Sequence, residues 1–181
     1  MKEQIRYHAL RLFDKNGFHG TSMRDIGDAV GCTMPTVYHH YGSKENLFDE
    51  VVRVAYIDLV DELSRQLKKG LSPQDYCAVS VIQKKKLSEE EMIIHRIALK
   101  TWLGCEGCDE VRQKLIEWEN ARIQKNDLLL SGIVSSSVWV RIITRTFMNL
   151  IERIILFGED IPDNDIREEM RLLFESASKN K

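Results

Sequence analysis

Residues 21–48 constrain the fold more than any other part of the chain, because they hold two short amphipathic segments that each end at a glycine. In the first segment, apolar residues recur at helical spacing: Met23, Ile26 and Val30. Thr21 is a suitable N-cap, since its hydroxyl can accept a hydrogen bond from a first-turn amide. Gly31 can adopt the positive φ that ends a helix, so we expect a helix from about Ser22 to Ala29.

The second segment has its own start and stop signals. Thr33 can cap a helix whose first turn holds Pro35, where a missing N–H does no harm. Gly42 ends that helix near Tyr41, and Ser43 caps the next. A small residue, Gly27, stands where two steeply crossing helices come closest. The spacing therefore predicts a helix-turn-helix, a motif that places its second helix in the major groove of DNA.

This segment resembles a known family. The run GCTMPTVYHHYGSKENLF (31–48) is similar to the recognition helix and following helix start of TetR/AcrR transcriptional regulators. The upstream run ALRLFDKNGF (9–18) resembles that family's first helix and the turn after it. Two departures are mild: Gly27 stands where alanine is usual, and Tyr41 where phenylalanine is usual. The resemblance covers about the first fifty residues.

The resemblance implies an all-α protein in two parts. Residues 1–47 would form a three-helix, helix-turn-helix DNA-binding domain, and residues 48–181 a larger helical domain for effector binding and dimerisation. It also implies two sets of DNA contacts. The residues implied at the major-groove edge are Thr33, Pro35, Thr36 and His39. Those implied near phosphates are Thr21, Tyr38, His40 and Lys44. For Tyr38, packing within the small domain is the alternative.

Composition fits a helical protein that binds DNA through one face. Hydrophobic residues make up 43% and charged residues 30%, with only 3 Pro. A net charge of -2 excludes a large surface that coats nucleic acid, so any positive field towards DNA must be local and aided by helix N-termini. There is no signal peptide and no uncharged apolar run near 18 residues, so we expect a cytoplasmic protein with no membrane contact.

After residue 43 every segment has helical periodicity, and no alternating strand pattern occurs. We expect helices over 44–69, 73–86, 89–103, 109–130, 135–157 and 163–176. The first of these would be about 40 Å long at about 1.5 Å per residue, enough to link two domains.

The segment 135–157 is apolar over most of its circumference, with one narrow polar stripe. Such a helix must bury two sides. One side can face its own core and the other a second subunit, which predicts a homodimer with interface residues Ile142, Leu150 and Ile154. The alternative is a central helix in the core of a monomer.

Large side chains on the later helices are candidates for an effector pocket: Tyr76, Met92, His95, Trp102, Trp118 and Phe147. Aromatic residues at helical spacing are typical of an ordinary core, and His95 on an apolar face is typical of a buried core histidine. The same composition also suits an apolar pocket with a few polar groups. The sequence leaves both interpretations open.

Two short motifs invite a chemical interpretation. Cys105 and Cys108 have the C-x-x-C spacing of metal and redox sites, but zinc needs about four ligands and no second pair is present. Reduced cysteines that pack in a turn are the simpler interpretation. Lys84, Lys85 and Lys86 suit a solvated helix end, where cations face the carbonyl pole.

These patterns favour a homodimeric transcriptional regulator, a repressor released from a palindromic double-stranded DNA operator by a small, largely apolar effector. The alternative is a regulator that senses oxidants or metal through Cys105 and Cys108. No catalytic set of Ser, His and Asp, phosphate-binding glycine loop or HExxH motif occurs, so an enzyme is not expected. Neither a cofactor nor a bound metal is expected.

Overall fold

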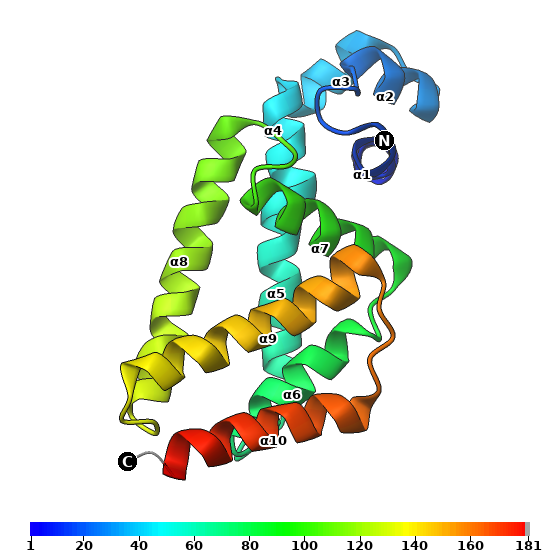
Figure 1. Cartoon of the computed structure of the whole chain (residues 1–181). Coiled ribbons are helices and arrows are strands. Elements are labelled where there is room, and N and C mark those ends of the chain that lie inside the picture. The colour runs from blue at the N-terminus through cyan, green and yellow to red at the C-terminus, as the bar shows by residue number, and fades with distance from the viewer. Residues whose placement is uncertain (180–181) are drawn as a thin grey trace. The chain divides into compact units, whose positions relative to one another are not determined.

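The computed structural model describes residues 1–179, and within that range the chain is helical, with no strand (Figure 1). The helices are α1 (Lys2–Asn16), α2 (Met23–Val30), α3 (Met34–Tyr41), α4 (Lys44–Phe48), η1 (Asp49–Val54), α5 (Ala55–Gln66), α6 (Pro73–Lys84), α7 (Glu89–Trp102), α8 (Asp109–Ser131), α9 (Ser137–Phe157) and α10 (Asp163–Lys179). The all-α fold class is therefore confirmed.

The chain forms two compact units. The first contains residues 1–60 and 89–117, and the second contains residues 61–88 and the chain from residue 118 onward. Helices α5 and α8 each contribute to both units. This division differs from the boundary after residue 47 that the sequence predicts, because α7 packs against α1 and η1 and so joins the first unit.

The helix-turn-helix forms where the sequence predicts it, with one change at its start. The N-cap of α2 is Ser22, whose hydroxyl accepts from the amide of Asp25 at 3.1 Å, while the Asp25 carboxylate accepts from the amide of Ser22 at 2.8 Å. These two bonds form a capping box. The pKa of Asp25 is lowered mainly by the Ser22 hydroxyl, which donates to its carboxylate at 2.6 Å, and next by the Ser22 amide. The prediction that Thr21 caps this helix is wrong.

The turn between α2 and α3 depends on two glycines. Gly31 adopts the left-handed conformation (φ 75°, ψ 31°) that ends α2. A Cβ on Gly27 would lie 2.9 Å from the carbonyl oxygen of Cys32, closer than two such atoms can approach. The small residue predicted at the crossing of the two helices is therefore required by the close approach of their backbones.

The long helix predicted over 44–69 is helical from Lys44 to Gln66, but its hydrogen bonding changes along its length. After α4, η1 is a stretch of π-helix in which the amide of Ala55 bonds the carbonyl of Glu50, five residues earlier. Helix α5 then ends at Gln66, three residues before the predicted end. Wide π-turns of this kind are uncommon and often lie at functional positions.

Three phenylalanines form the centre of the first unit. Phe13 on α1, Phe18 in the α1–α2 turn and Phe48 on α4 are all buried. The Phe48 ring packs edge-on against both others, with centroids 5.0 Å apart, and the Phe13 and Phe18 rings stack at 6.1 Å. This cluster, the Phe13–Phe18–Phe48 cluster below, joins α1, the α1–α2 turn and α4.

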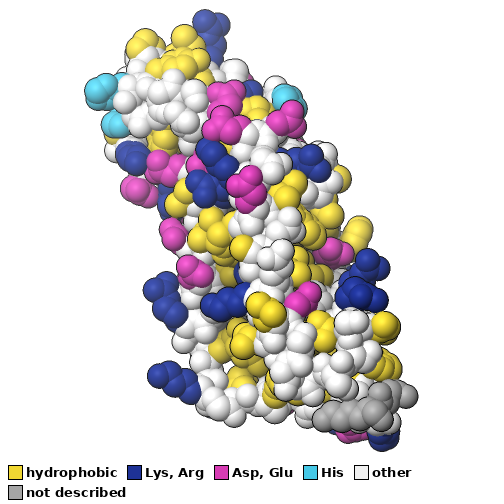
Figure 2. Space-filling model, turned by 90° about the vertical axis from the view of Figure 1, so that its left-hand side faces the viewer, with side chains coloured by type: hydrophobic (Ala, Val, Ile, Leu, Met, Phe, Trp, Pro, Cys, Tyr) yellow, Lys and Arg dark blue, Asp and Glu magenta, His cyan; other side chains and the backbone are white. Residues whose placement is uncertain are grey.

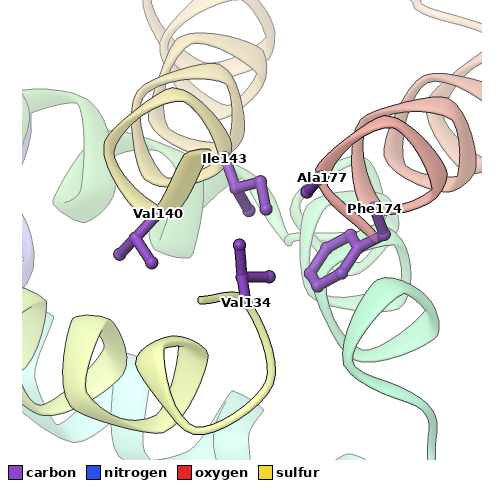
Figure 3. Close-up of a cluster of buried hydrophobic side chains, with 5 residues drawn as sticks. All are labelled: Val134, Val140, Ile143, Phe174 and Ala177. Carbon is purple, nitrogen blue, oxygen red and sulfur yellow. The ribbon is translucent and has the colours of Figure 1, made fainter. Parts of the chain in front are cut away.

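In the second unit, α10 packs against both α6 and α9. Figure 3 shows side chains from α9, α10 and the α8–α9 connection converging on one another. The residues of this cluster are Val134, Val140, Ile143, Phe174 and Ala177. They supply the apolar burial that joins the C-terminal helices.

The lysine run at the end of α6 is not a solvated helix end, so that expectation is wrong for two of its residues. Lys84 is buried, and this burial lowers the pKa of its ammonium to about 8, with the Arg122 guanidinium acting in the same direction and Glu119 opposing it. Lys85 donates to the carbonyl of Ile161 at 2.7 Å and pairs with Asp163 at 2.8 Å. These contacts fasten the end of α6 to the α9–α10 connection.

Among the described residues, no helix is both long enough and apolar enough to cross a lipid bilayer.

Candidate nucleic-acid interface and cavity

Helix α3 presents most of its polar residues to solvent. Thr33, Pro35, His39 and His40 are exposed, and Thr36 is partly exposed. The hydroxyls of Thr33 and Thr36 share a hydrogen bond of 3.0 Å, and this bond orders the first turn of the helix. Val37, on the opposite side, is fully buried and anchors α3 to the rest of the unit. An exposed polar face on a helix held by one buried side is the arrangement that groove recognition requires.

Two exposed side chains add apolar surface to α3. Tyr38 is 44% exposed, so it does not only pack within the small unit, which was the alternative for this residue. Met34, at the first position of the helix, is 41% exposed. Met34 was not among the predicted contacts, although its place between Thr33 and Pro35 could have identified it. An exposed apolar group at the start of a recognition helix can contact the methyl group of thymine.

Thr21 is not placed for the phosphate contact that the resemblance implies. Thr21 is only 1% exposed, and its hydroxyl donates to the carbonyl of Gly17 at 2.8 Å. The carbonyl of Leu12, 3.1 Å from the same hydroxyl, is a second acceptor. Thr21 therefore fastens the α1–α2 turn to the end of α1. The N-cap position predicted for Thr21 is taken by Ser22.

Lys44, also implied as a phosphate contact, has a structural role in this conformation. Its ammonium donates to the carbonyls of Phe18 at 2.9 Å and Thr21 at 3.1 Å. It also lies 4.2 Å from the centre of the Phe18 ring, in cation–π contact. Two of its three N–H groups are thus used within the unit, and one is left for an outside partner.

Charge is mixed on the one face of the molecule that Figure 2 shows. On the face seen in Figure 2, Lys and Arg side chains are interspersed with Asp and Glu and do not form one broad basic block. This agrees with the net charge of -2 and with the expectation that any positive field towards DNA is local.

The second unit contains a cavity of about 230 Å³. The residues that line it come from the start of α6, the second half of α8, the middle of α9 and the connections beside them: Leu71, Pro73, Tyr76, Cys77, Asn126, Leu129, Leu130, Ile133, Ile143, Thr144 and Phe147. None of these side chains carries a formal charge. Exposed lining residues such as Leu129 and Ile133 place its opening towards solvent.

Few polar groups face this cavity. Thr144 donates its hydroxyl to the Asp127 carboxylate at 2.7 Å, so its hydrogen is already used. Burial raises the pKa of the Cys77 thiol to about 11, which keeps the thiol neutral. Asn126 supplies an amide. The cavity therefore suits an uncharged, mainly apolar molecule with one or two hydrogen-bonding groups.

Comparison with known proteins places this geometry in a family. Residues 5–51 match the family model described as bacterial regulatory proteins, tetR family. A similar relative is the HTH-type transcriptional repressor KstR2 of Rhodococcus jostii (strain RHA1), 38% identical over 63 residues, which are 35% of this chain and 31% of that protein. Residues 5–51 therefore form a DNA-binding domain of the tetR family type.

Likeness to solved TetR-family structures extends over nearly the whole chain. A TetR-like transcriptional regulator from Rhodococcus sp. RHA1 superposes with a TM-score of 0.73 at 18% identity, covering 99% of this chain and 96% of that one. The multidrug binding protein EbrR, in complex with malachite green, gives 0.69 at 14% identity, covering 96% and 97%. At these identities the likeness shows the fold. In sequence, the match spans only about a third of the length of the curated relative.

Only some of the residues predicted to form an effector pocket are brought together. Tyr76 and Phe147 line the cavity, but Trp118 does not. Met92, His95 and Trp102 belong to the first unit, where His95 is buried with its ring 5.0 Å from that of Tyr56. The core interpretation is thus correct for His95. Leu71, Asn126 and Thr144 were missed, because helical periodicity shows that a residue is buried but not whether it faces a cavity.

Two of the three predicted interface residues are wrong. Leu150 and Ile154 are buried within the chain, so they cannot contact a second subunit in this conformation. Ile142 is 38% exposed, and it shares α9 with Val138, which is 51% exposed. Leu172 on the neighbouring helix α10 is exposed as well. The narrow polar stripe of the predicted helix 135–157 indicated that two of its sides are buried. It did not indicate which apolar residues face the chain's own core and which face a second subunit.

Cys105 is exposed and Cys108 partly buried, and both are free thiols. Within residues 1–179, no group of three or more His, Cys, Asp and Glu side chains is arranged to hold a metal ion. The geometry thus gives no support to metal sensing by this pair.

Replacing Lys44 with methionine should destabilise the first unit. The change keeps the length of the side chain but removes the donor to two turn carbonyls, and hydrogen bonds to charged groups contribute about 1.5–3 kcal/mol. We expect urea denaturation, followed by circular dichroism, to show a loss of that order. Lys15→Met, at an exposed position of α1, is the control and should change stability little. Equal stability of the two variants would contradict the structural role of Lys44.

Proposed function

We propose that this chain is a DNA-binding transcriptional repressor. The observation that carries the proposal is the exposed polar face of α3 within a TetR-family helix-turn-helix. The named relative KstR2 is a transcriptional repressor, which supports the choice of repressor over activator.

In this proposal α3 enters the major groove. Thr33, Pro35, Thr36 and His39 face base edges, and Met34 contacts a thymine methyl group. Tyr38, His40 and the remaining N–H of Lys44 contact phosphates, which positions the helix without selecting sequence.

Substitutions on α3 should separate these roles. Thr36→Ala and His39→Ala should alter base preference at one or two positions, by about 1–3 kcal/mol per base pair, because they remove groups that face base edges. Tyr38→Phe should instead weaken binding to all sequences about equally, because it removes only a phosphate contact. Selection from a random double-stranded DNA library, followed by fluorescence anisotropy, measures both effects. Gln4→Ala, exposed on α1, is the control.

Failure to enrich any sequence with the wild-type protein would refute specific DNA binding. Identical preferences for wild type and His39→Ala would refute the assignment of that residue to bases.

The proposed repressor acts as a homodimer on a palindromic operator. Val138 and Ile142 on α9 and Leu172 on α10 are exposed apolar residues on two packed helices. A surface of this kind on two adjacent helices is suited to pair with its symmetry mate. A two-fold dimer would present two α3 helices to half-sites about 34–36 Å apart or a multiple of that distance.

Sedimentation velocity at micromolar concentration tests the dimer. We expect a species of twice the 21.0 kDa chain mass, and Ile142→Glu should dissociate it because a charge cannot be buried unpaired at the interface. Leu103→Glu makes a similar change at an exposed position of the first unit and should leave the dimer intact. A wild-type protein that sediments only as a monomer would reject this part of the proposal.

The effector that releases the repressor is proposed to occupy the cavity of the second unit. Its size, neutral lining and few polar groups suit a small, largely apolar molecule. EbrR, which shares the fold, binds malachite green, and this supports ligand binding by the same architecture. Helices α5 and α8 each run from one unit into the other, so a shift in the second unit has a continuous path to the first.

The uncharged fluorescent probe N-phenyl-1-naphthylamine tests the cavity. We expect the probe to bind the wild type, Cys77→Phe to weaken binding at least about tenfold by filling the space, and Cys77→Ser to bind as wild type does. Because coupling is reciprocal, operator DNA should weaken binding of a true effector by the same factor, about 5–150, by which that effector weakens operator binding. Probe binding that Cys77→Phe leaves unchanged would exclude this cavity as the site.

A further inference from the structure

A single carboxylate in the α7–α8 connection contacts the turn between α1 and α2. Glu106 Oε1 accepts a hydrogen bond from the backbone amide of Phe18 at 2.6 Å and another from the amide of Gly107 at 3.0 Å. Phe18 lies in the α1–α2 turn, 88 residues earlier in the chain. An ionised acceptor makes bonds of this kind roughly twice as strong as those between neutral groups.

The same turn residue is held from its other side. The carbonyl of Phe18 accepts from the Lys44 ammonium at 2.9 Å, and its ring belongs to the Phe13–Phe18–Phe48 cluster. Opposite charges therefore hold the two polar backbone groups of one buried residue. The orientation of the α1–α2 turn, from which α2 begins, is defined by these contacts.

The approach of the connection to the turn is close. A Cβ on Gly17, at φ 75°, would lie 2.9 Å from Glu106 Oε2. A Cβ on Gly107, at φ 89°, would lie 3.0 Å from Cε1 of Phe48 and 2.9 Å from Cγ2 of Thr101. Both positions favour glycine because of their positive φ. At Gly107 the close approach to Phe48 and Thr101 also shows that the backbone of the connection lies directly on the aromatic cluster.

An ion pair also joins α7 to α1. Arg96 on α7 makes a bidentate pair with Asp14 on α1, with N···O distances of 3.0 and 2.7 Å. This pair joins the bodies of the two helices, whereas Glu106 reaches the turn that leads into α2. Of these two contacts, only the one made by Glu106 acts on the backbone between α1 and α2.

We propose that Glu106 is a positioning residue for DNA binding: it fixes the α1–α2 turn, and through it α2 and α3, in the orientation that matches the groove. This inference rests on the proposed DNA-binding function. Helices α2 and α3 lose less conformational entropy on binding when they are already held in the binding orientation. Removing the hydrogen bond between Glu106 and the Phe18 amide should therefore weaken operator affinity, although no group that contacts DNA is removed.

The experiment compares Glu106→Ala and Glu106→Gln in the full-length chain. The first variant removes the acceptor, and the second keeps a carbonyl oxygen in nearly the same shape and serves as the conservative variant should the first not fold. Glu110→Ala is the control, because the exposed Glu110 pairs only locally with Lys114, four residues along α8. Hydrogen exchange at the Phe18 amide, followed by NMR, measures the hydrogen bond to Glu106 itself. Fluorescence anisotropy on selected operator and on random-sequence DNA measures its consequence, at a temperature where each variant is fully folded.

We expect faster exchange at Phe18 and operator affinity about tenfold weaker in Glu106→Ala, with partial recovery of both in Glu106→Gln and no change in Glu110→Ala. Affinity for random-sequence DNA should stay at the wild-type value, since every phosphate contact remains. If the Phe18 amide of Glu106→Ala exchanges at the wild-type rate, the hydrogen bond from this amide to Glu106 does not hold the turn. Faster exchange with unchanged operator affinity would overturn the positioning role. If the wild type selects no operator, the proposed DNA-binding function fails, and the exchange measurement still decides whether the hydrogen bond to Glu106 holds the turn.

Discussion

Burial of the Phe13–Phe18–Phe48 cluster is the interaction on which the first unit depends. Each ring comes from a different segment, so the cluster forms only when α1, the turn after it and α4 meet. The closely approaching backbone at Gly107 shows that the α7–α8 connection is also seated on it. Aromatic pairs at these distances contribute beyond their buried area, and loss of one ring would leave a cavity shared by three elements.

Polar contacts around the cluster have a different task from the rings. The rings supply burial without a fixed direction, whereas the hydrogen bonds of Thr21, Lys44 and Glu106 specify one arrangement of the turn backbone. Buried backbone groups that lack partners are costly, so these side chains also complete the hydrogen bonding of a segment that belongs to no helix. Thr21 and Lys44, which were expected near phosphates, thus also hold the turn between α1 and α2.

The second unit contains a packed apolar core and, beside it, a cavity. Ile143 belongs to the cluster of Figure 3 and also lines the cavity, so the two lie side by side. A ligand in the cavity would thus touch a residue on which the packing of α9 and α10 depends. Close-packed helices respond to such changes by shifting as bodies, which makes the position of this cavity suitable for control.

The sequence by itself determined the helices of the first fifty residues and nearly all later helix ends, because caps, glycines and prolines act within a few residues. Gly31, Ser43 and Pro73 lie where local chemistry places them. Tertiary structure decided which buried faces meet. Leu150 and Ile142 share one apolar helix, yet only Leu150 is buried in the chain, and His95 and Phe147 are both partly or fully buried, yet only Phe147 lines the cavity. Helical periodicity shows which side chains are buried. Which residues they then contact depends on packing between segments that are far apart in the sequence.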